Sequence, residues 1–298
     1  MSEFAFMIGN SLVENIVTIN DYHNRGANME DFRPDQCSNR WKLPELWSVV
    51  SDFEDEIAKK VHHNLINEAD YPNILFHAAS KTIITMREII ILCGNGYPNG
   101  ALSLARNIYE QFIICTFLYQ HKDDSNFPTI VRNYHLSYDF KRNNALQYEA
   151  EFCTKDTVEL SRLKTEKNSL VASVAPYNTK KDYWWAGKNS FRELVDSVID
   201  NETDESFIVF LHQLYLFYQR ACASIHAGAL GNEALLGIDE ELIGTDTRPQ
   251  IAGHDFPLYY ATNSFIGIIG VVAKEFKFDC NNLIVSLNAL SKYYQKNN

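Results

Sequence analysis

The stretch TDESFIVFLHQLYLFYQRACASIHAG, Thr203 to Gly228, decides the predicted fold. Its apolar residues recur at steps of four and three, the period of one packed helix seam: Phe207, Leu211, Leu214, Tyr218, Ala221 and Ile225. Further apolar side chains widen that seam on both flanks, namely Ile208, Phe210, Tyr215, Phe217 and Cys222. A seam this broad predicts a largely buried central helix around which other helices pack.

The polar residues of this helix fall on two lines. At about 100° per residue, the first line contains Gln213, Arg220 and Ser224, and the second contains His212, Gln219 and His226. An arginine in a dry core needs partners, because an unpaired buried charge is strongly destabilising. Either polar side chains from other helices meet this face, or the face opens on a cleft.

The remainder of the chain repeats helical apolar spacing, and no alternating strand pattern extends far enough to build a sheet. We therefore expect an all-α fold, a single bundle-like domain of about eight to nine helices. Residues 1–42 are the least patterned and form an N-terminal arm, and residues 43–298 form the all-α domain. Irregular linkers are expected near residues 174–189 and 228–256.

Composition narrows the functional classes. The chain has 298 residues, 46% of them hydrophobic, which is enough for a sizeable core. Its net charge of −11 argues against a protein surface that binds phosphates non-specifically, although a local basic groove is compatible with it. Six cysteines without CxxC spacing indicate reduced thiols in a cytoplasmic protein. The start of the chain lacks a basic signal region, and the most apolar run, residues 265–273, is about half the length of a membrane span. No membrane association is expected.

A second polar group lies on the helix expected over residues 100–120. Arg106 and Glu110 are four residues apart and can meet on one face. If this helix packs on the 203–228 helix, the pair can join Arg220 and His226 in one polar cluster. His212, Gln219 and Ser224 would support that cluster from the same helix.

The end of the 203–228 helix reads RACASIH, with Arg220 and His226 separated by five residues. This spacing resembles the Arg-x(4 to 6)-His motif of the HEPN superfamily (higher eukaryotes and prokaryotes nucleotide-binding), all-α proteins that include metal-independent ribonucleases of toxin and anti-phage defence systems. One departure is Ala221, where the family often has a polar side chain. The resemblance implies catalysis by Arg220 and His226, RNA as substrate, a homodimer, and an antitoxin or defence-system partner protein.

Three separated segments resemble, in order, an uncharacterised family of bacterial all-α proteins of unknown function. They are GYPNGALSLARNIYE, YWWAGKNSFRELVD and YQRACASIHAG, which together span roughly residues 91–231. This resemblance carries no assigned activity and implies only the all-α fold.

The ribonuclease chemistry needs few groups. A ribose 2′-hydroxyl attacks the adjacent phosphate, a neutral histidine exchanges a proton near pH 7, and an arginine stabilises charge on the phosphoryl oxygens. Six residues on an ideal helix place Arg220 and His226 about 120° apart. They share a site if the helix frays near Gly228, if the arginine side chain reaches round, or if two protomers each supply one residue.

The alternative is a non-catalytic interaction or ligand-binding protein in which the same residues form a buried polar brace. In that case Arg220 pairs with a buried carboxylate, for which Glu110 is the candidate, and His226 hydrogen-bonds a helix end or loop. The two hypotheses differ in the solvent access of Arg220 and His226.

Two further groups of residues are candidate binding sites. The aromatic-basic segment Lys181, Trp184, Trp185 and Lys188 either stacks bases and binds phosphates, or uses its tryptophans to plug a gap between helices. Histidines near acidic residues, at His62–His63, His121 and His254, reproduce no recognised ligand spacing. We expect no metal and no cofactor.

Overall fold

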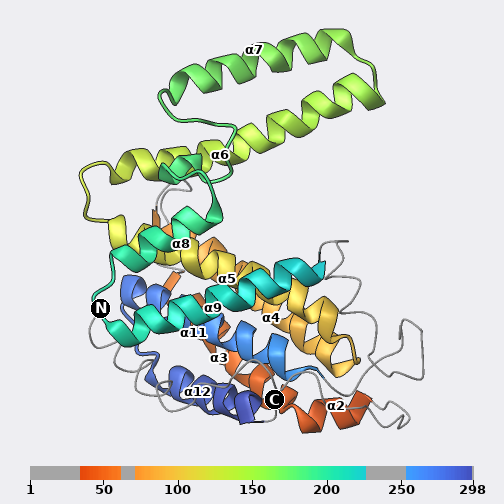
Figure 1. The fold of residues 1–298 in the computed structure, drawn as a ribbon, viewed down its shortest axis with the longest axis vertical. Coiled ribbons are helices and arrows are strands. Elements are labelled where there is room, and N and C mark those ends of the chain that lie inside the picture. The colour runs from red at the N-terminus through yellow and green to blue at the C-terminus, as the bar shows by residue number, and fades with distance from the viewer. Residues whose placement is uncertain (1–33, 62–70, 226–252, 297–298) are drawn as a thin grey trace. The chain divides into compact units, whose positions relative to one another are not determined.

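The computed structural model describes residues 34–61, 71–225 and 253–296. Within these ranges the regular structure is entirely helical, which confirms the all-α prediction. Ten α-helices are present there (Figure 1): α2 (Pro34–Arg40), α3 (Leu43–Val61), α4 (Tyr71–Gly94), α5 (Pro98–His121), α6 (Phe127–Tyr148), α7 (Thr157–Ser173), α8 (Phe191–Asp200), α9 (Glu205–Ile225), α11 (Asp255–Phe276) and α12 (Asn281–Lys296).

The helices group into two compact units. Among the described residues, unit 1 comprises 34–61, 75–116, 202–225 and 253–296, and unit 2 comprises 71–74 and 117–201. The predicted division into an arm of residues 1–42 and one domain of residues 43–298 stays a prediction, and α2 lies inside the predicted arm. The predicted linker at 174–189 is irregular except for a short 3-10 turn, η3 (Trp184–Ala186). The linker at 228–256 lies mostly outside the described residues.

The most deeply buried helix of unit 1 is α11. Every residue from Pro257 to Ala273 is buried, and α11 packs on α12, α3 and α9. A Cβ atom at Gly267 would lie 2.2 Å from the Phe112 Cε2 atom, so only glycine permits this approach of α11 to α5. The sequence assigned the central position to residues 203–228, and that assignment is wrong in this respect: α11 is enclosed on all sides, whereas α9 is not.

Length and composition alone would allow α11 to cross a bilayer. The whole helix is 22 residues long, whereas the apolar run noted in the sequence covers only residues 265–273. Of the most apolar 18-residue stretch of α11, 94% is buried inside the protein. The core helix of a soluble protein passes the same test, so this property is weak evidence about membranes.

Helix ends follow the expected capping chemistry. The spacing of Ser190 and Glu193 in the sequence predicts a capping box at the start of α8. The Ser190 hydroxyl accepts a hydrogen bond from the Glu193 backbone N–H at 3.3 Å, which confirms that end of the box. The Glu193 carboxylate reaches back to the Asn189 N–H at 2.9 Å, one residue before the N-cap. At α7, the Asp156 carboxylate accepts from the N–H groups of Val158 and Glu159, both at 3.0 Å. These bonds satisfy first-turn donors that a helix leaves unpaired.

In unit 2, α6 continues into a π-helical turn, η2 (Glu149–Cys153), before the chain reverses into α7. The sequence predicts one helix from residue 129 to about residue 153, and the structure changes its hydrogen-bond pattern over the last five of these residues. Residues 155–170 carry many charges and few large apolar side chains, which predicts a helix on the outside of the protein. Residues of α7 other than Leu163 are exposed or half-buried, which confirms this prediction.

The six cysteines form no disulfide. Cys37, Cys93 and Cys115 are buried, Cys222 and Cys280 are half-buried, and Cys153 is exposed. Burial raises the pKa of the Cys115 thiol to about 12, so this group is protonated and unreactive near neutral pH.

Candidate functional site

Helix α9 has one buried side and one exposed side. The seam predicted from the sequence is buried at Phe207, Leu211, Leu214 and Ala221. On the opposite side, Val209 is 54% exposed and Leu216 is 50% exposed. The flank of α9 that carries these two residues is therefore open, and it lies between the two polar lines whose surroundings the sequence left undecided.

The buried side of α9 meets α5 through a polar contact at Tyr218. The Arg106 Nη2 atom donates to the Glu110 Oε1 atom at 2.6 Å and to the Tyr218 hydroxyl at 3.1 Å. The Tyr218 hydroxyl in turn donates to the same Glu110 oxygen at 2.9 Å. The Arg106 guanidinium carbon also lies 5.1 Å from the centroid of the Tyr218 ring. We call these three residues the α5–α9 brace.

The α5–α9 brace is partly shielded from water, and its positive and negative charges pair with each other. About a quarter of each side chain of the ion pair is exposed, 26% for Arg106 and 23% for Glu110. Burial opposes the charge on Arg106, but the hydrogen bond with Tyr218 and the Glu110 carboxylate raise the Arg106 pKa above its ordinary value overall. Burial, reinforced by the nearby Glu110 charge, raises the pKa of the Tyr218 hydroxyl. The phenol therefore stays neutral and the guanidinium charged across the physiological range.

Tyr218 is the member of the brace that the sequence did not indicate. Its position fits the spacing of the apolar residues along α9, and that spacing predicts a core side chain. The available signal was its hydroxyl, because a buried tyrosine usually needs a hydrogen-bond partner and the predicted Arg106–Glu110 pair could supply one.

Arg220 takes no part in the brace. Its side chain is half-buried, and no hydrogen bond or ion pair joins it to another residue in the described ranges. The Glu110 carboxylate bonds to Arg106 and Tyr218 instead. The interpretation of Glu110 as the partner of Arg220 is therefore wrong, because the i, i+4 neighbour and the packed tyrosine occupy that carboxylate.

Of the other predicted site residues on this helix, two are exposed and two have side chains outside the described part. His212 and Gln219 are exposed, whereas Tyr218 of the same helix turns toward α5. The described part of α9 ends at Ile225, so His226 lies outside the described residues. Ser224 belongs to α9, but its side chain is also outside the described part. The structure thus unites Arg106 and Glu110 and leaves the meeting of Arg220 with His226 a prediction.

The aromatic-basic segment of unit 2 is a plug in the helix packing. The Trp184 ring packs edge-on against Phe140 at a centroid distance of 5.3 Å, and the Trp185 ring does so against Tyr134 at 4.9 Å. Both indoles are buried, so neither can stack on a nucleic-acid base, and that hypothesis is wrong for the two tryptophans. Lys181 is exposed and Lys188 is half-buried.

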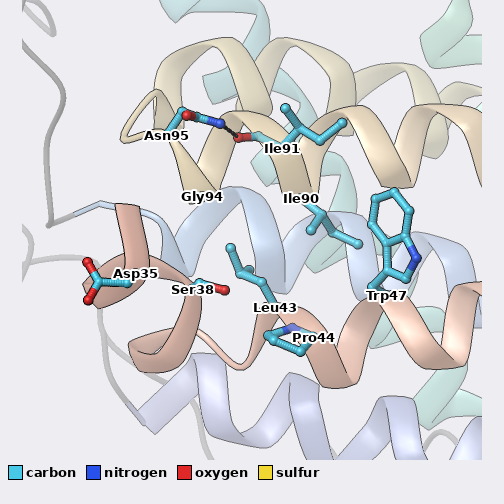
Figure 2. A pocket seen from close by; sticks show the side chains of 9 residues that line it. All are labelled: Asp35, Ser38, Leu43, Pro44, Trp47, Ile90, Ile91, Gly94 and Asn95. Atoms are coloured by element: carbon cyan, nitrogen blue, oxygen red, sulfur yellow. Dashed lines mark hydrogen bonds between the residues drawn. The ribbon is translucent and has the colours of Figure 1, made fainter. Parts of the chain in front are cut away.

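Unit 1 also contains an open hollow of about 430 Å³ between α2, the start of α3 and the end of α4 (Figure 2). Its lining is largely apolar, and among the described residues that line it Asp35 is the only ionisable one. No described residue of α9 contributes to it. Because Asp35 and the Ser38 hydroxyl are not joined there by a described base, these lining residues offer no catalytic arrangement. Its lining residues are Asp35, Ser38, Leu43, Pro44, Trp47, Ile90, Ile91, Gly94 and Asn95.

Comparison with known proteins places this chain in a family. Residues 73–243 match a family described as a family of unknown function, DUF5677. The chain belongs to this family. The match confirms the sequence resemblance to an uncharacterised all-α family, and the DUF5677 region includes α4 to α9 with both the brace and Arg220. No curated protein and no solved structure matches the chain significantly.

Proposed function

We propose that this protein is a metal-independent ribonuclease of the HEPN type, acting through Arg220 and His226 in a toxin or anti-phage defence system. The observation that carries the proposal is the state of Arg220. Its guanidinium is half-buried near the end of α9 and is joined to no carboxylate within the described residues. Such an arginine keeps its donors for a phosphate, whereas a paired arginine does not.

The contrast with Arg106 strengthens this assignment. Arg106 shares the Glu110 carboxylate with Tyr218, so its role is to join α5 to α9. Arg220 lies on the same helix as Tyr218, two residues further on, without an equivalent partner in the part of the chain that is described. Arg220 is therefore the arginine of this region whose guanidinium remains available to bind an anion.

The proposed reaction needs no metal ion. The 2′-hydroxyl of one ribose attacks the adjacent phosphorus while the 5′-oxygen of the next nucleotide leaves, which gives a 2′,3′-cyclic phosphate. His226 takes the proton of the attacking 2′-hydroxyl and returns it to the leaving 5′-oxygen, and Arg220 stabilises the charge on the phosphoryl oxygens. Because an ideal helix separates the two residues by about 120°, the proposal includes a homodimer in which each protomer contributes to a shared site.

A cleavage assay with single variants tests this function. Purified wild type, Arg220→Ala, Arg220→Lys and His226→Ala are incubated with single-stranded RNA in the presence of EDTA, and products are separated on gels. We expect cleavage by wild type, loss of at least about a hundredfold for His226→Ala and for Arg220→Ala, and partial activity for Arg220→Lys. Arg142→Ala, which removes an exposed arginine of unit 2, is the matched control and should cleave normally. Cleavage that is equal in all variants would refute the assignment.

The second candidate is a non-catalytic interaction protein, and the α5–α9 brace favours it. A partly buried polar network whose carboxylate is already paired is what a structural element requires. The two candidates separate cleanly in the assay above, because a protein without nuclease activity leaves the RNA intact in every variant, including wild type.

A further inference from the structure

Two contacts of different kinds hold the last turns of α9 within unit 1. On the α11 side, the Phe217 ring packs edge-on against the rings of Phe256 and Tyr259, at centroid distances of 5.1 and 5.8 Å. On the α5 side, the Tyr218 hydroxyl makes the hydrogen bonds of the α5–α9 brace. Ring packing tolerates small rotations, whereas hydrogen bonds weaken when their angles change. The brace is therefore the contact that sets how the end of α9 is rotated about its own axis.

The start of α9 is held without the brace. The Asp204 carboxylate accepts from the backbone N–H groups of Ser206 at 2.9 Å and Phe207 at 3.1 Å, which satisfies donors of the first turn. The Phe207 ring also packs edge-on against Phe112 of α5, at a centroid distance of 6.5 Å. Loss of the brace would therefore affect mainly the end of α9, and that end carries Arg220.

The direction of the Arg220 side chain depends on this rotation. Arg220 follows Tyr218 by two residues, so it lies about 200° further round the helix. Because Tyr218 faces α5, Arg220 lies on the side of α9 that is turned away from α5. Its guanidinium is at the end of a long side chain, so a small rotation of the helix moves it further than it moves the backbone. A catalytic group displaced by about 1 Å can slow a reaction about a hundredfold.

We infer that Tyr218 and Glu110 are positioning residues for the proposed ribonuclease, and that they act by fixing the direction in which Arg220 meets the phosphate of RNA. The shared oxygen of Glu110 holds both Arg106 and Tyr218, so removal of either the carboxylate or the phenol hydroxyl opens the brace. The inference rests on the proposed function and names the residues that support its arginine. Such supporting residues keep a functional side chain in its working geometry.

Steady-state cleavage of single-stranded RNA by the full chain tests this role. Wild type is compared with Tyr218→Phe, which keeps the ring and removes the hydroxyl, and with Glu110→Gln and Glu110→Ala. The matched control is Ser291→Ala. The Ser291 hydroxyl of α12 accepts from the Asn263 side-chain amide of α11 at 2.9 Å, so this variant also removes a hydrogen bond between two helices of unit 1 but leaves α9 unchanged. Urea denaturation of each variant identifies the conditions in which all are folded.

We expect Tyr218→Phe to lower kcat at least about tenfold with KM changed less than about threefold, because the group that it misdirects acts in the transition state. Glu110→Gln retains an acceptor oxygen and should keep more activity than Glu110→Ala. Ser291→Ala should keep kcat within about twofold of wild type, since a structural bond elsewhere does not affect the chemical step. An unchanged kcat in both Tyr218→Phe and Glu110→Ala, or an equal loss in Ser291→Ala, would overturn the inference.

A second measurement asks whether Tyr218 acts through Arg220. A lysine at position 220 carries its charge on a flexible stem without directional fork geometry, so its action depends less on the rotation of α9. Adding Tyr218→Phe to Arg220→Lys should therefore slow cleavage less than about twofold, a clear departure from additivity. Equal slowing in both backgrounds would show that Tyr218 does not act through Arg220.

The two proposals fail in different ways. If wild type does not cleave RNA, the proposed ribonuclease function is wrong and the positioning role is wrong with it. If wild type cleaves RNA and the brace variants cleave it equally well, the ribonuclease function stands and only the positioning role is wrong.

Discussion

Helices α9 and α11 have nearly the same length, 21 and 22 residues, and both are rich in large apolar side chains. Helix α11 is buried from Pro257 to Ala273, whereas α9 exposes Val209 and Leu216 and turns Tyr218 inward to a polar brace. The two sequences differ in their acidic and basic residues. None occurs between Asp255 and Lys274 in α11, whereas the middle and end of α9 carry His212 and Arg220. A broad apolar seam therefore predicts burial less well than an uncharged circumference does.

The largest expected effect concerns the enclosed helix. Gly267→Val places side-chain atoms where the Phe112 ring lies, 2.2 Å from the position of the first added carbon. We expect the free energy of unfolding to fall by about 3 kcal/mol, at the upper end of the usual overpacking range. Urea denaturation followed by circular dichroism measures this change. A loss below about 1 kcal/mol, less than overpacking usually costs, would contradict the close packing of α11 on α5.

The brace side of α9 should show the next largest effect. Glu110→Ala leaves Arg106 without its carboxylate, and we expect a loss of about 2 kcal/mol, below the range for fully buried pairs because the pair is partly exposed. A double-mutant cycle between Glu110→Ala and Tyr218→Phe should show coupling, since both side chains share one hydrogen bond. Strictly additive losses would show that the brace does not act as a unit.

Alkaline pH tests the enclosed side through its tyrosines. Burial raises the pKa of Tyr259 in α11 to about 12 from an ordinary 10.0. Because the folded state binds this proton more tightly, its contribution is complete below pH 10 and is lost as the pH rises from 10 to 12, by up to about 1.4 kcal/mol per pH unit. Tyr259→Phe should therefore reduce the fall in unfolding free energy between pH 10 and 11. An unchanged pH dependence would contradict the burial of this hydroxyl.

A small effect is expected on the exposed side of α9. Leu216→Ser replaces a half-exposed side chain and should change the unfolding free energy by no more than about 0.5 kcal/mol, whereas Leu211→Ala on the buried side should lower it by about 2 kcal/mol or more. Parallel urea titrations compare the two variants. Similar losses for both would contradict the division of α9 into a buried side and an exposed side.

Much of the helical layout was predictable because each helix carries its own periodic apolar pattern and its own ends. The Ser190 cap of α8 and the Arg106–Glu110 pair are local features, set by residues three or four apart, and both formed as predicted. That Glu110 would pair with Arg106 and not with Arg220 was not predictable from spacing alone, because it depended on how the side chains of α5 and α9 meet.

Long-range packing also determined the other differences from the sequence predictions. Tyr218 matched the apolar seam by spacing, and only its contact with α5 revealed a polar role. Trp184 and Trp185 resembled a base-stacking platform in sequence, and only the fold of unit 2 places them against Phe140 and Tyr134. Residue type and spacing thus indicated which side chains matter, while their partners required the structure.

The central claim is that Tyr218 of α9 belongs to the α5–α9 brace and Arg220 of the same helix does not. The most direct test is the unfolding free energy of Arg220→Ala, measured by urea denaturation beside wild type. Because no described residue pairs with Arg220, we predict a change within about 0.5 kcal/mol, typical of a side chain outside any structural network. A loss of about 2 kcal/mol or more, the scale of a broken buried pair, would show that Arg220 is itself a brace and would contradict its assignment to a phosphate-binding site.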